Sequence, residues 1–115
     1  MRYILPFLLA ISPLCAQQPK PIDYALLGVS TTLIVIDWNQ TRRGAADPDR
    51  REVNPLLGSH PSASRVNTYF AVCALGTLAL MRLPSNARRL TWGGVILLES
   101  FWILYNRHYG LRIAI

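Results

Sequence analysis

Three long apolar stretches, almost free of charged residues, dominate the sequence. They cover residues 22–38, 66–81 and 90–105, and charged or turn-forming residues bound each of them. At about 1.5 Å per residue, a hydrocarbon core of about 30 Å needs about 20 residues, and each stretch can be extended through neutral flanks towards that length. We therefore expect an all-α fold, a small helical membrane bundle with three transmembrane helices.

A soluble three-helix bundle is the alternative. The chain has 115 residues, of which 51% are hydrophobic and 16% are charged. Helices that are apolar on every side must be buried on every side in water, and a chain of this size cannot bury three of them completely. The composition therefore favours the membrane interpretation.

Local signals give approximate bounds for these helices. The first is expected over about 22–41, and the second between the start signals at Pro61 and Ser62 and a stop near Pro84. Residues 84–89 are expected to form a tight turn, after which the third helix continues to about residue 108.

The N-terminal leader differs from the three stretches. It contains Arg2, an apolar run with two prolines, and then small and polar residues, which is the form of a secretory signal peptide cleaved after Ala16. Because Leu14 occupies a position where a small residue is preferred, an uncleaved signal anchor that forms a short fourth span is the alternative. We expect a signal peptide or signal anchor over residues 1–16 and a three-span membrane domain over residues 17–115.

The distribution of charge predicts the topology. Twelve Lys and Arg against six Asp and Glu give a formal charge of +6. If the N-terminus starts inside and each apolar segment crosses once, the leader included, the central loop 39–65 and the C-terminus lie inside and carry most of the basic residues. The same topology follows if the leader is cleaved. The positive-inside rule then predicts that this ordered loop and the C-terminus face the cytoplasm. The expected location is the inner membrane if the protein is bacterial, and the host inner membrane if a phage encodes it.

The expected partners follow from the basic loop and the apolar helices. The basic loop contains no aromatic residue that would stack on bases, so nucleic acid is not an expected partner. The lipid bilayer, a second copy of the chain or another membrane protein fits the apolar helices better.

Polar residues inside the spans are few and regularly placed. Asp23, Ser30 and Asp37 are seven residues apart, so they share one face of the first helix. Glu99 lies in the middle of the third stretch, where a carboxylate costs at least about 2.5 to 3.5 kcal/mol on insertion scales, so it should face another helix. A hydrogen bond that fixes helix packing and a role in binding ions or protons are both open interpretations.

The central loop brings a second group of polar residues near the first helix. Asp37 and Thr41 can approach Glu52, Asn54 and His60 because the loop joins the same ends of the first two helices. Asp37, Glu52 and His60 are candidate ligands of a divalent metal, the one cofactor the sequence suggests, and His60 with Glu52 is a usable acid and base pair. The spacing matches no standard catalytic motif, which favours a role without catalysis. The structural alternative is that the carboxylates pair with arginines and that His60 and Asn54 cap helix ends or bind loop carbonyls.

Two segments around this loop carry a resemblance. "DWNQTRRGA" at residues 37–45 and "EVNPLLGSHPSASRVNTYF" at residues 52–70 resemble a family of small, uncharacterised membrane proteins of bacteria and their phages. That family has a D-W-x-Q-T-R element at the end of one span and an E-x-N-P-[IL]-L-G-x-H-P-S element before the next. The resemblance covers about a third of the chain and implies a topology without an activity. By this resemblance the family-defining positions are Asp37, Thr41, Arg42, Glu52, Asn54, Pro55, Gly58, His60 and Pro61.

The sequence leaves three functional hypotheses. The first is a small integral inner-membrane protein whose structured loop serves helix packing or partner docking. The second is a holin-like phage lysis protein that forms pores by helix association. The third is a membrane enzyme or metal site that uses Asp37, Glu52 and His60.

Overall fold

The computed structural model describes residues 18–110, and all of its regular secondary structure is helical. The elements are α2 (Pro21–Ala45), α3 (Ala63–Ala79), a short 3-10 turn η1 (Leu80–Arg82) and α4 (Ser85–His108). The predicted all-α fold is confirmed. The predicted signal peptide or signal anchor lies outside the described residues.

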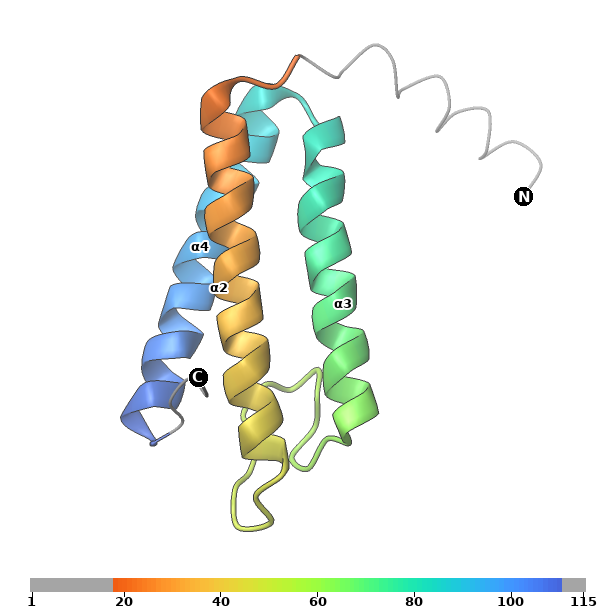
Figure 1. Cartoon of the computed structure of the whole chain (residues 1–115), viewed down its shortest axis with the longest axis vertical. Helices are drawn as coiled ribbons and strands as arrows, with labels where there is room; N and C mark the ends of the chain where they lie inside the picture. The colour runs from red at the N-terminus through yellow and green to blue at the C-terminus, as the bar shows by residue number, and fades with distance from the viewer. Residues whose placement is uncertain (1–17, 111–115) are drawn as a thin grey trace, which may run out of the picture.

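The helices form an up-down-up arrangement with α2 in the middle. α2 packs against both α3, which runs antiparallel to it, and α4, which runs parallel to it (Figure 1). The connection between α3 and α4 lies at one end of the bundle, beside the start of α2, and the longer loop between α2 and α3 lies at the other end. α2 therefore shares an interface with each of the other two long helices.

Local chemistry sets the start of each helix. Pro21 occupies the first turn of α2, and the Asp23 carboxylate accepts a hydrogen bond from the backbone N–H of Lys20 at 2.7 Å. In α3 the Ser62 hydroxyl accepts a hydrogen bond from the backbone N–H of Arg65 at 3.1 Å. The expected start signal at Ser62 is thus an N-cap.

Two expected boundaries differ from the structure. α2 continues through the basic residues to Ala45, so the loop is shorter than expected and covers residues 46–62. The segment 84–89 is not a tight turn, because α4 already begins at Ser85, directly after Pro84. A proline immediately before the first turn is compatible with a helix start, and the arginines at 88 and 89 become helical residues.

Polar side chains are concentrated in the interior. Among residues 18–110, eight polar or charged residues are buried, compared with five hydrophobic ones. The hydrophobic part is a small cluster near the loop, where Ile34, Leu57, Val66 and Phe70 pack together. Trp92, also buried, donates its indole N–H to the backbone oxygen of Thr77 at 3.1 Å and so joins α4 to α3.

Within residues 18–110, one helix combines the length and apolar composition needed to cross a membrane. That helix is α2, near the N-terminus of the chain. The expected membrane crossings by α2, α3 and α4 all remain predictions.

Candidate functional site

Two carboxyl groups meet at the interface between α2 and α4. The side chains of Asp37 and Glu99 lie within interaction range of each other, and they are 6% and 8% exposed. Two buried ionised carboxylates that face each other repel, so this arrangement favours one proton shared by the pair. Sequence reasoning named both residues but did not pair them.

The hydrogen bonds around the pair converge on Asp37. Its Oδ1 accepts one bond from the Thr41 hydroxyl at 3.2 Å and another from the Asn106 side-chain amide at 2.9 Å. The same Asn106 amide lies 3.5 Å from the side-chain oxygen of Gln40. Two neighbouring helices therefore contribute both the carboxyl groups and the donors that orient them.

The third helix closes this site from the side. Tyr69 and Cys73 lie one helical turn apart on α3, and both are close enough to Glu99 to interact with it electrostatically. Asn54 of the loop donates its side-chain amide to the Tyr69 hydroxyl at 3.1 Å. The site thus receives residues from all three helices and from the loop.

Glu52 and Asn54 shape the loop through hydrogen bonds to its backbone. Oε1 of Glu52 accepts from the backbone N–H groups of Val53 and Asn54 at 3.0 and 2.8 Å. The Asn54 side-chain oxygen accepts from the backbone N–H of Leu56 at 3.0 Å, which is an Asx turn. The Glu52 N–H also binds the Ser59 carbonyl at 2.9 Å, so the ends of the turn are joined.

The turn delivers Leu57 to the bundle. Leu57 is 1% exposed and lies in the hydrophobic cluster with residues of α2 and α3. Gly58 follows with φ +80°, a backbone conformation that other residues rarely adopt. Arg65 donates to the Leu56 carbonyl at 3.2 Å and holds the turn against the start of α3.

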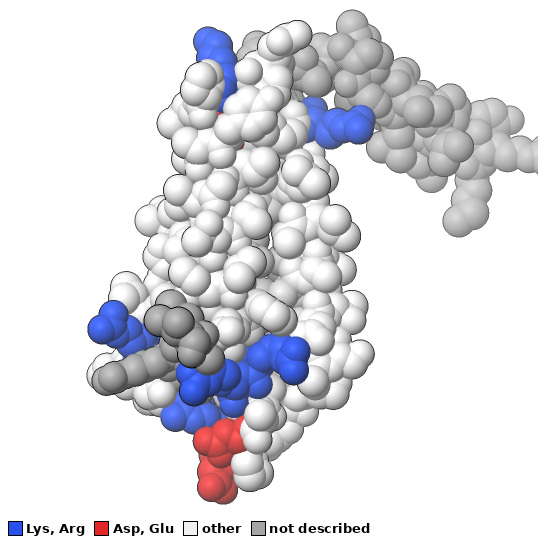
Figure 2. Space-filling view, viewed as in Figure 1, with Lys and Arg blue, Asp and Glu red and all other residues white. Residues whose placement is uncertain are grey.

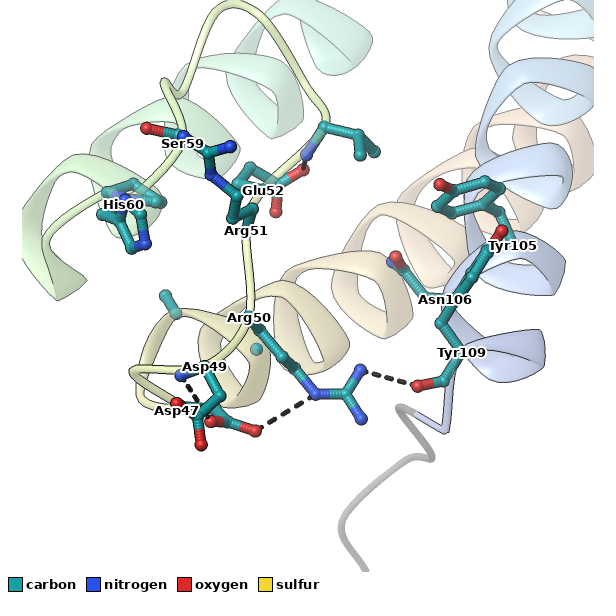
Figure 3. Close-up of a pocket in the computed structure, with 14 residues that line it drawn as sticks. Asp47, Asp49, Arg50, Arg51, Glu52, Ser59, His60, Tyr105, Asn106 and Tyr109 are labelled. Atoms are coloured by element: carbon teal, nitrogen blue, oxygen red, sulfur yellow. Dashed lines mark hydrogen bonds and ion pairs between the residues drawn. The ribbon is translucent and has the colours of Figure 1, made fainter.

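A cavity of about 530 Å³ opens beside this site, between the loop and the ends of α2 and α4 (Figure 3). Glu52, His60 and Asn106 are among its lining residues. Arg50 reaches across it, with Nη1 donating to the Tyr109 carbonyl at 2.7 Å and Nε lying 3.2 Å from the carboxylate of Asp47. The loop is therefore tied to the end of α4 as well as to α3.

A separate polar cluster occupies the opposite end of the bundle. Asp23 is fully buried and binds two arginines, with Arg88 Nη2 2.7 Å from Oδ2 and Arg89 Nε 2.7 Å from Oδ1. The negative charge of Asp23 is thus matched by two guanidinium groups at the start of α4. Ser30, one seven-residue step along α2, is also fully buried.

The sequence-predicted residues therefore fall into several groups. Asp37 and Thr41 lie in the carboxyl site, while Glu52 and Asn54 shape the loop beside it. His60 is exposed on the cavity wall. Arg42 points elsewhere, with Nη1 3.4 Å from the Asn67 side-chain oxygen and its guanidinium 5.9 Å from the centre of the Trp38 ring.

The metal hypothesis gains no ligand set from this arrangement. Across residues 18–110, no group of three or more His, Cys, Asp or Glu side chains is placed to hold a metal ion, so Asp37, Glu52 and His60 do not form one.

Sequence reasoning missed the roles of Arg88, Arg89 and Asn106. Arg88 precedes the buried Trp92 by four residues, and Asn106 follows Glu99 by seven, so both continue the inward face of α4. Helical periodicity counted from Trp92 and Glu99 gives the positions of Arg88 and Asn106, but it does not single out Arg89.

Comparisons of the chain with protein-family models, with curated proteins and with solved structures gave no match.

Proposed function

We propose that the chain is a small integral membrane protein whose three helices cross the bilayer and whose loop closes one end of the bundle. The observation that carries this proposal is the distribution of side chains, which is the opposite of that in a water-soluble protein. Sixteen large hydrophobic residues are exposed in the part of the chain that the structure describes, while the buried set is mostly polar or charged. In water such a surface would be an extended apolar patch, whereas in lipid it is the expected outer surface.

The surface charges support the same placement. Figure 2 shows Lys and Arg side chains at both ends of the visible face and Asp or Glu at the loop end, with a wide band between them that carries neither. The ends of a membrane protein face water and headgroups, and the band between them faces hydrocarbon.

The helix lengths are compatible with three crossings. At about 1.5 Å per residue, the 25 residues of α2 and the 24 residues of α4 give about 37 and 36 Å. α3 has 17 residues and is continued by the three residues of η1, which brings it close to the hydrocarbon thickness. Only 22% of the most apolar window of α2 is buried, whereas the core helix of a soluble protein would be buried over most of its length.

The loop is assigned a packing role, with a docking surface on its outer side. Leu57 is inserted between α2 and α3, while Leu56 and Val53 are 67% and 47% exposed. The positive-inside rule places this loop and the C-terminus in the cytoplasm, and a bacterial protein of this kind in the inner membrane. There the exposed loop residues are available to headgroups or to a membrane protein partner.

Extraction of membranes tests the proposal. We expect the chain to remain in the membrane pellet after alkaline carbonate treatment and to enter the supernatant only with detergent. A peripheral protein of the same membranes, released by carbonate, is the control. Release of this chain by carbonate alone would overturn the proposal.

A further inference from the structure

The contact between Asp37 and Glu99 assigns the proton of the pair. Asp37 Oδ1 already accepts hydrogen bonds from Thr41 at 3.2 Å and Asn106 at 2.9 Å. A carboxyl oxygen that accepts two hydrogen bonds is stabilised as the ionised form. Asp37 is therefore the carboxylate, and Glu99 is the acid that donates to it.

No donor group reaches one oxygen of Glu99. Its Oε2 is buried, and within residues 18–110 no hydrogen-bond donor is placed to bind it. A buried carboxyl oxygen without a donor is costly to keep ionised. This favours a proton on Glu99.

The titratable neighbours of the pair come from α3 and from the loop. Tyr69 and Cys73 face Glu99 from α3, and Glu52 acts electrostatically on Asp37 from the loop. Of these neighbours Glu52 is a carboxylate, and its negative charge favours retention of the proton by the pair.

The pair is close to water on the loop side. Asn106 donates to Asp37 and also lines the cavity of about 530 Å³, as does Glu52. Figure 3 shows Asn106 and Glu52 on the two sides of that cavity, on α4 and on the loop. One side chain, that of Asn106, thus contacts both the carboxyl pair and the cavity.

We propose that Asp37 and Glu99 form a proton-binding site that exchanges one proton with the aqueous phase on the loop side. In the bound state the proton lies on Glu99 and is shared with Asp37. On release the Glu99 O–H bond breaks, the proton passes to water in the cavity, and two adjacent carboxylates remain on α2 and α4. This inference goes beyond the proposed function and does not depend on how many helices cross the bilayer.

Infrared spectroscopy of the purified full-length chain tests the site, because protonated and ionised carboxyl groups absorb separately. The chain has only six Asp and Glu side chains, so one protonated carboxyl is resolvable. We expect a protonated-carboxyl band at neutral pH that disappears reversibly at alkaline pH while the helical circular dichroism is retained. Transfer of the native protein to D₂O should shift the band, and this readout needs no variant.

Two variants assign the band. Glu99→Gln should remove it, while Asp49→Asn, which changes an exposed carboxylate, should leave it unchanged. If Glu99→Gln does not fold, Glu99→Asp should keep the band at a shifted position. The proposal is overturned if the band is absent at neutral pH, survives in Glu99→Gln, or does not respond to D₂O or to alkaline pH in the folded protein. The responses to D₂O and to alkaline pH distinguish a site that exchanges its proton with water from a packing contact that keeps its proton.

Discussion

Arg88 places its guanidinium 2.7 Å from the carboxylate of Asp23, although 65 residues separate them and both side chains are fully buried. Arg88 also donates to the backbone oxygens of Leu83 and Gln18, at 3.2 and 3.4 Å. This ion pair therefore joins the start of α2, the start of α4 and the segment before each of them.

Replacement of Asp23 tests how much this ion pair stabilises the bundle. Asp23→Asn should lower the melting temperature, because the buried Arg88 guanidinium then faces a neutral amide. Asp47→Asn is the matched control, since the pair of Asp47 with Arg50 is partly exposed and should contribute at most about 1 kcal/mol. Thermal loss of helical circular dichroism measures both variants. Equal shifts for the two would contradict a structural role for Asp23.

The insertion of Leu57 gives a second prediction. Leu57→Ala should lower the free energy of unfolding by about 2–5 kcal/mol, because it removes buried methyl groups from the cluster with Ile34 and Phe70. Leu56→Ala is the control, and because that side chain is 67% exposed its effect should stay within about 0.5 kcal/mol. Denaturant unfolding in detergent measures the difference. If the two variants behaved alike, the loop would not be packed as described.

A charged substitution tests whether the exposed face of α4 contacts lipid. Leu97 is 75% exposed near the middle of α4. In lipid, Leu97→Arg should cost about 2.5–3.5 kcal/mol, whereas the same substitution on a water-exposed surface should stay within about 0.5 kcal/mol. Leu56→Arg on the loop is the control. The amount of folded protein recovered from membranes measures the cost, and equal recovery of the two variants would argue against lipid contact at α4.

His60 distinguishes the metal hypothesis from the loop as a packing element. Because His60 is exposed on the cavity wall, His60→Ala should change stability by less than about 0.5 kcal/mol. It should also leave the metal content of the purified protein unchanged, as measured by elemental mass spectrometry. Stoichiometric metal in the wild type that disappears in His60→Ala would instead support the site at Asp37, Glu52 and His60.

Helical periodicity predicted much of the buried interior. The seven-residue spacing of Asp23, Ser30 and Asp37 predicted a shared face, and all three side chains are buried. The cost of a carboxylate in an apolar stretch predicted that Glu99 would face another helix, and it contacts Asp37. These inferences depend on helical spacing and on the free-energy cost of burying a charge, and both can be inferred from the sequence alone.

The partners of these residues were harder to predict, because they depend on how the helices are aligned along one another. The sequence prediction placed Arg88 and Arg89 in an exposed turn. In the structure both guanidinium groups bind the carboxylate of Asp23. The direction of Leu57 depends on the hydrogen bonds of Glu52 and Asn54 within the turn, and no periodic pattern encodes it.

The sidedness of the two ends of the bundle tests the central claim most directly. Single cysteines at Ser59→Cys in the loop and Asn86→Cys at the start of α4, both exposed, would be placed in a chain lacking Cys15 and Cys73. We predict that a membrane-impermeant maleimide labels the loop position only in inside-out vesicles and the α4 position only in right-side-out vesicles. Labelling of both positions from the same side of the membrane would contradict a bundle that spans the bilayer.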